Sequence, residues 1–127
     1  MALQNFLMAK GFPGFSYDRQ GGLVTWRGTL QPRTCSPEYQ IQVQYSIRTT
    51  PKVKVVWPPL ALKAPHLYHD GTLCLYWTDE WRWRPDQIIA QTLLPWAALW
   101  LYFYELWLDT GEWLGPSSHQ TPPADKR

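Results

Sequence analysis

The sequence has little excess charge and few cysteines. Its 127 residues include 12 basic and 10 acidic side chains, which gives a formal net charge of +2. A protein that binds nucleic acid by neutralising phosphates needs a basic face, and this balance does not predict one. The two cysteines, Cys35 and Cys74, allow at most one disulfide. The opening residues, MALQNFLMAKGF, lack the long apolar run and the A-x-A exit of a signal peptide. We therefore expect a cytoplasmic protein with both cysteines as thiols.

A long uncharged stretch runs from Gln87 to Tyr104 and is about long enough to suggest a membrane span. Pro95 interrupts this stretch, Glu105 follows it at once, and its flanks show no positive-inside bias. We therefore expect a buried core helix and no membrane association.

Aromatic residues, by contrast, are abundant. They make up 16% of the chain and include nine tryptophans. That is enough to fill a small core and still leave rings for a surface, so tryptophan content does not single out one function. With 45% hydrophobic residues, the chain fits one domain, which we predict over residues 1–115, followed by a flexible tail at 116–127.

Period-two alternation predicts a sheet. Residues 39–47 alternate apolar side chains with glutamines and a serine, which is typical of a strand with one buried face. Residues 23–30 (LVTWRGTL) follow a Gly21-Gly22 turn, and residues 52–57 (KVKVVW) are closed by Pro58-Pro59, so both are predicted strands. The links between the three strands are short, which favours an antiparallel meander.

Helices are expected at both ends. Residues 2–10 suit a short helix that closely spaced glycines and a proline end. Near the other end, Asp86 can cap a helix over residues 85–93, and Pro95 is expected to start a second helix that continues to Leu108. One apolar stripe of this second helix should pack on the sheet. Its members are Trp96, Leu99, Trp100, Phe103, Leu106 and Trp107.

The polar residues that could carry out chemistry lie between residues 60 and 84, where the sequence shows no helical or strand periodicity. They are His66, His69, Asp70 and Cys74. Cys74 stands between Leu73 and Leu75, so one interpretation is a buried core thiol. The functional interpretation is a thiolate nucleophile, activated by a nearby imidazole or by backbone amides that also steady an oxyanion.

Two other site classes are less well supported by the pattern. Two cysteines and three histidines could supply four zinc ligands, but there is no C-x-x-C or H-x-x-x-H pair. A papain-like protease needs a cysteine at a helix start with a distant His and Asn, and Asn5 is the only asparagine here. We therefore predict neither a metal nor another cofactor.

At these residues the sequence resembles the ubiquitin-conjugating enzyme family. That family carries a Trp-containing strand, a Pro-Tyr strand start, a Pro-Pro-Lys-Val strand, His-Pro-Asn, an Asp/Asn-Gly before Ile/Val-Cys-Leu, and Trp-Ser-Pro opening a helix. The counterparts occur in the same order between Leu23 and Leu94. They are Trp26 and Leu30 with Pro32, Pro37 and Tyr39, Pro51-Lys52-Val53, Pro65-His66, Asp70-Gly71-Thr72-Leu73-Cys74-Leu75, and Trp83-Arg84-Pro85.

The resemblance implies an α+β fold in which an antiparallel meander is flanked by an N-terminal helix and C-terminal helices. It further implies that Cys74 takes a protein's C-terminal carboxyl as a thioester and passes it on. His66 replaces the family's asparagine, so an imidazole could supply a hydrogen bond or act as a base there. The tryptophan-rich end resembles the divergent bacterial branch of the family, found in CBASS antiphage operons.

In such operons the implied partner is the C-terminal tail of a cGAS-like cyclic-oligonucleotide synthase, with an activating enzyme as a second candidate partner. Supporting or tail-binding roles fall to His69, Asp70, Trp77 and Asp79. A different class of function stays open, in which the protein is an inactive relative that binds another protein through the same surface. The role of His119 is left open.

Overall fold

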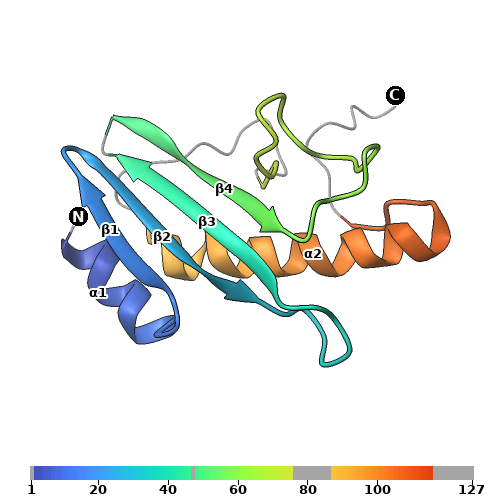
Figure 1. Cartoon of the computed structure of the whole chain (residues 1–127), viewed down its shortest axis with the longest axis horizontal. Helices are drawn as coiled ribbons and strands as arrows, with labels where there is room; N and C mark the ends of the chain where they lie inside the picture. Colours follow the sequence, from blue (N-terminus) through green and yellow to red (C-terminus); the bar gives the residue numbers. More distant parts are fainter. Residues whose placement is uncertain (1, 47, 76–86, 116–127) are drawn as a thin grey trace.

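Four strands form one antiparallel meander in a computed structural model of the chain, which describes residues 2–46, 48–75 and 87–115 (Figure 1). The strands follow one another in the sheet in chain order, and a helix precedes and another follows them. The elements are α1 (Ala2–Gly11), β1 (Ser16–Gln20), β2 (Leu23–Leu30), β3 (Tyr39–Ser46), β4 (Thr49–Trp57), a 3-10 turn η1 (Ile89–Gln91) and α2 (Leu93–Thr110). This arrangement confirms the α+β prediction.

The alternation of β3 places one face of the sheet in the core. Tyr39, Ile41, Val43 and Tyr45 are buried, whereas the residues between them are exposed or half-buried. Val43 lies opposite Trp26 of β2 and Val53 of β4, so the three strands bury the same face. The predicted strands at 23–30, 39–47 and 52–57 are confirmed apart from their ends, since β4 begins at Thr49 and Ile47 lies outside the described residues.

The strand β1 was not predicted. All five of its residues are exposed, so it carries no buried position that alternation could reveal. It forms the edge of the sheet and pairs with β2 through the predicted Gly21-Gly22 turn, where Gly21 has a φ of 61°.

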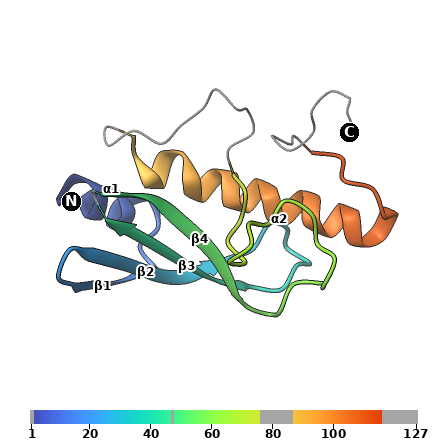
Figure 2. The same ribbon diagram turned by 90° about the horizontal axis from the view of Figure 1, so that it is seen from above.

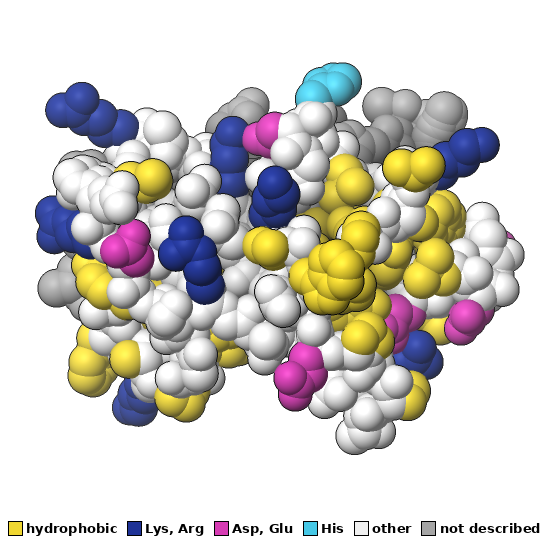
Figure 3. Space-filling view, in the orientation of Figure 1, with side chains coloured by type: hydrophobic (Ala, Val, Ile, Leu, Met, Phe, Trp, Pro, Cys, Tyr) yellow, Lys and Arg dark blue, Asp and Glu magenta, His cyan; other side chains and the backbone are white. Residues whose placement is uncertain are grey.

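The opposite face of the sheet is polar. In the orientation of Figure 1, basic side chains are spread over the sheet, and hydrophobic side chains gather near the end of β4 (Figure 3). Val56 and Trp57, the last residues of β4, are about half exposed, at 49% and 58%. No helix among the described residues is long and apolar enough to cross a membrane.

The first helix is fastened to the chain segment that precedes the last one. The Gln4 amide donates to the Gln87 carbonyl (2.6 Å) and accepts from the Ile89 amide (2.9 Å). The Trp26 indole also donates to Asn5 Oδ1 at 3.4 Å, which ties α1 to the buried face of the sheet. Figure 2 shows α1 beside the beginning of α2, on the side of the sheet that α2 covers.

The division of the C-terminal helices differs from the prediction. Residues 87–92 form a bend and a 3-10 turn rather than an α-helix, and α2 begins at Leu93, so Pro95 lies inside its first turn. Proline is tolerated there because the first turn has no intrahelical partner for its missing N–H. Pro85 and the predicted cap Asp86 lie outside the described residues.

The buried face of α2 is also rotated from the predicted stripe by about one residue, or roughly 100°. Of the predicted members only Trp100 is fully buried, while Leu99 is 38% exposed. Apolar side chains lie nearly all round this helix, so periodicity alone could not select the face. The residues that do face the core are Leu93, Leu94, Ala97, Trp100, Leu101, Tyr104 and Glu105.

Candidate functional site

A small hairpin formed by residues 66–74, which we term the site hairpin, brings two predicted site residues together. Leu67 and Leu73 form an isolated antiparallel bridge. The Tyr68 amide donates to the Thr72 carbonyl at 2.9 Å, and the Cys74 amide donates to the His66 carbonyl at 3.0 Å. Because the bridge pairs 67 with 73, the next residues outward, His66 and Cys74, also lie opposite each other. Gly71, at a φ of 85°, lets the turn close.

The sheet holds this hairpin through Leu73. Its amide donates to the Val53 carbonyl of β4 at 2.8 Å, and Leu73 and Leu75 both belong to the hydrophobic core. Successive side chains of extended backbone point to opposite sides, so we expect the Cys74 side chain to point away from the side that the two leucines occupy. Cys74 is nevertheless buried, with 3% of its surface exposed, and neither it nor the exposed Cys35 is in a disulfide.

His66 has an unusual backbone conformation and contacts two tryptophans. Its φ is +60°, in the left-handed region that Asn, Asp and His adopt more readily than other side chains. Its carbonyl accepts from the Trp100 indole at 3.3 Å as well as from the Cys74 amide. Its imidazole lies 4.8 Å from the Trp113 ring, centre to centre, at an interplanar angle of 60°.

A sequence model of type II CBASS E2 proteins matches residues 4–120. The chain belongs to that family. No curated protein matches it closely enough to be reported as a relative. Family membership makes it an E2-like protein of antiphage defence and implies a protein partner encoded in the same CBASS operon.

In this CBASS E2 protein the other predicted site residues are not all brought to Cys74. His69 is exposed in the turn of the site hairpin, three residues along the chain from His66. Asp70 also lies in the turn. Trp77 and Asp79 lie outside the described residues, as do Trp83, His119 and the predicted tail at 116–127.

Asp70 closes the turn of the site hairpin. Its Oδ1 accepts from the backbone amide of Thr72 (3.0 Å) and from its hydroxyl (2.6 Å), and its Oδ2 contacts Lys52 Nζ at 2.8 Å. The Lys52 ammonium and then the Thr72 bonds hold the pKa of Asp70 well below its usual range. Asp70 therefore remains a carboxylate acceptor that shapes the turn and joins it to β4.

A hollow of about 350 Å³ lies on the core side of the site hairpin. Its described lining combines apolar side chains with the Lys52–Asp70 ion pair at 2.8 Å. The residues are Thr50, Pro51, Lys52, Val53, Tyr68, Asp70, Thr72, Leu73, Leu75 and Leu93. Within the described ranges no three His, Cys, Asp or Glu side chains are grouped to hold a metal ion.

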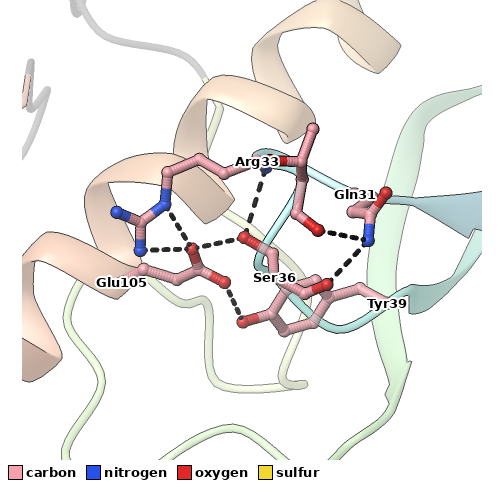
Figure 4. A network of polar contacts seen from close by, with 6 residues as sticks. Gln31, Arg33, Ser36, Tyr39 and Glu105 are labelled. Atoms are coloured by element: carbon pink, nitrogen blue, oxygen red, sulfur yellow. Dashed lines mark hydrogen bonds and ion pairs between the residues drawn. The ribbon is translucent and has the colours of Figure 1, made fainter.

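A second polar centre, missed by sequence reasoning, surrounds Glu105 of α2 (Figure 4). Its Oε1 accepts from Arg33 Nε (3.1 Å), Arg33 Nη2 (2.9 Å) and Ser36 Oγ (2.7 Å), and its Oε2 accepts from the Tyr39 hydroxyl (2.8 Å). Burial acts to raise the pKa of Glu105, but the bonds from Ser36, Tyr39 and Arg33 outweigh it and lower the pKa overall. This charge therefore fastens the loop between β2 and β3 to α2.

Burial, followed by the bond to Glu105, raises the pKa of Tyr39 well above its usual range. Tyr39 accordingly stays protonated and can donate its hydrogen bond at any ordinary pH. No sequence motif predicts the buried position of Glu105, because a lone glutamate in a helix is usually exposed. The only available signal was that Glu105 ends a long uncharged stretch.

Proposed function

We propose that this CBASS E2 protein is a thioester-forming acyl transferase whose nucleophile is Cys74. The thiolate Sγ attacks the activated carbonyl carbon at the C-terminus of a partner protein, and the thiol of an activating enzyme leaves. An amine or water then attacks the Cys74 thioester, and the Cys74 thiolate is expelled. We propose the C-terminal tail of a cGAS-like synthase as the acyl group carried.

The observation that carries this proposal is the pairing of Cys74 with His66 across the site hairpin, through a 3.0 Å backbone bond. It places the thiol-bearing residue opposite a residue whose side chain can donate a proton or accept one. The core leucines on either side of Cys74 anchor this pairing, so the two residues are held by the sheet rather than by a free loop. Rigid placement of this kind favours attack geometry.

One observation favours a second function, a protein-binding module without chemistry. Cys74 is only 3% exposed, whereas a nucleophile must meet a carbonyl carbon at about van der Waals distance. A buried thiol beside core leucines is a common structural feature. The two functions differ in one measurable respect, which is whether Cys74 reacts covalently.

The test is co-expression with the neighbouring synthase and activating enzyme of the operon, followed by intact mass measurement. We expect an adduct of the partner's mass that dithiothreitol releases, and we expect it in the wild type and in Cys35→Ser. Cys35 is the matched control, because it is an exposed thiol remote in sequence from the site hairpin.

Cys74→Ala should lose the adduct and phage protection while melting within about 5 °C of the wild type, since removing one sulfur costs about 1 kcal/mol. Protection that persists in a folded Cys74→Ala protein would overturn the transferase proposal. A stable complex with the partner, without any thiol-labile adduct, would establish the binding module instead.

A further inference from the structure

The chain beyond α2 turns back toward the site. Gly111 caps the helix in the left-handed conformation, at a φ of 78°, and its amide donates to the Trp107 carbonyl at 2.8 Å. The Glu112 amide then donates to Thr110 Oγ1 at 3.1 Å, which tightens the reversal. Figure 1 shows this segment leaving the end of α2 and returning along the helix toward the part of the chain that follows β4.

Close packing holds the returning segment, residues 111–115, against α2. The Trp113 ring lies 5.5 Å from Trp100 and 6.2 Å from Phe103, centre to centre. Gly115 approaches the Phe103 ring so closely that an added Cβ would lie 2.5 Å from its Cδ2 atom. These contacts therefore fix the position of residues 111–115 along α2.

Two tryptophans consequently hold His66 from different directions. Trp100 donates its indole N–H to the His66 carbonyl at 3.3 Å, and Trp113 lies against the imidazole at 4.8 Å. Because Trp100 and Trp113 also contact each other, the backbone and the ring of His66 are fixed by one aromatic unit. Neither Trp100 nor Trp113 was predicted from the sequence to be part of the site.

We infer that Trp113 is a positioning residue for the imidazole of His66. This inference rests on the proposed function, in which His66 acts opposite Cys74. An imidazole that donates to an oxyanion or accepts a proton must present one nitrogen in a fixed direction. The large neighbouring ring restricts rotation of the imidazole, so Trp113 selects the orientation that faces the reacting atoms.

The test compares Trp113→Leu and Trp113→Phe with Trp107→Leu in the full chain. Trp107 is the matched control, since it is a half-buried tryptophan of the same helix end that stacks on Tyr104 at 6.0 Å. We expect Trp113→Leu to slow single-turnover discharge of the synthase from Cys74 by about tenfold to a hundredfold, as misplacement of a catalytic group does. Trp113→Phe should keep most of the rate, and Trp107→Leu nearly all of it.

Two further measurements separate positioning from general stability. In a His66→Gly background, Trp113→Leu should slow discharge by less than about twofold, because a residue that acts through His66 has nothing left to position. The nuclear Overhauser contacts between the His66 ring protons and the site hairpin should also change in Trp113→Leu and stay the same in Trp107→Leu. Equal slowing of discharge with and without His66 would overturn the inference.

The failure of the inference can be told apart from failure of the proposed function. If Cys74→Ala still protects against phage, the transferase proposal fails, and the NMR comparison alone decides whether Trp113 orders His66. If Cys74→Ala is inactive while Trp113→Leu discharges at the wild-type rate with unchanged contacts of the His66 ring, only the positioning inference fails.

Discussion

Removing the Glu105 carboxylate should destabilise the protein far more than removing an exposed one. Glu105→Ala deletes the acceptor of four hydrogen bonds, two of them from the hydroxyls of Ser36 and Tyr39 in buried residues. A buried donor left without a partner costs about 1–3 kcal/mol. The Arg33 side chain is 38% exposed, so water can solvate its charge and it adds little. We therefore expect a loss of about 3 kcal/mol, or roughly 12 °C in melting temperature.

Thermal unfolding followed by circular dichroism measures this loss. Glu38→Ala is the matched control, because Glu38 is an exposed carboxylate at the end of the same β2–β3 loop. It should melt within about 2 °C of the wild type. If Glu105→Ala melts as high as Glu38→Ala, the carboxylate is not what fastens the loop to α2, and the reasoning fails.

The pH dependence gives a second measure of the same centre. The pKa of Glu105 is lowered in the folded protein, so its contribution to stability is complete above the unfolded value, about 4.3. It is lost as the pH falls through the lower folded value. The stability difference between the wild type and Glu105→Gln should therefore be constant from pH 6 to 8 and should shrink below about pH 4. A difference that grows as the pH falls would contradict this sign.

Substitutions at His66 and Gly28 test the local geometry. His66→Asn should keep the melting temperature, because asparagine tolerates the positive φ, whereas His66→Ala should cost about 1 kcal/mol of strain. If His66 donates to the oxyanion, His66→Asn should discharge the thioester faster than His66→Ala does. If His66 acts as a base, both variants should be equally slow, and the wild-type discharge rate should rise with pH. Gly28→Ala should lose about 1–3 kcal/mol, since its Cβ would lie 2.4 Å from the Phe15 ring, whereas Gly22→Ala, with nothing within 4 Å, should melt near the wild type. Equal melting of the two alanine variants would refute the contact.

The sequence predicted the elements that bury a regular face. Alternation located β3 and β4 because each places buried residues at every second position, whereas β2 was located by the Gly21-Gly22 turn before it. The edge strand β1 was not predicted because all its residues are exposed, so it shows no alternation of buried and exposed positions. The buried face of α2 could not be predicted because apolar residues surround the helix. Its acidic core residue, Glu105, can be buried because it bonds to partners 66 to 72 residues away in the chain.

The candidate site could likewise be predicted only in part, where its residues are close in the sequence. That His66 and Cys74 share one loop with a tight turn could be predicted, because both lie within a few residues of Gly71. The tryptophans that hold His66 could not, since Trp100 meets it across 34 residues and Trp113 depends on the turn at Gly111. Contacts of this range are set by packing and leave no local pattern.

The order of the strands bears on how the protein is completed during synthesis. The meander pairs only strands that follow one another along the chain, so the whole sheet can form once β4 has left the ribosome. The partners of Gln4 and Arg33 are made later, 85 and 72 residues further on. Both tryptophans that hold His66 are also made after the sheet. We therefore expect the sheet of a nascent chain to form before the site is complete. A chain that has emerged from the ribosome only as far as the start of α2 would display Cys74 without Trp100 and Trp113, which hold His66.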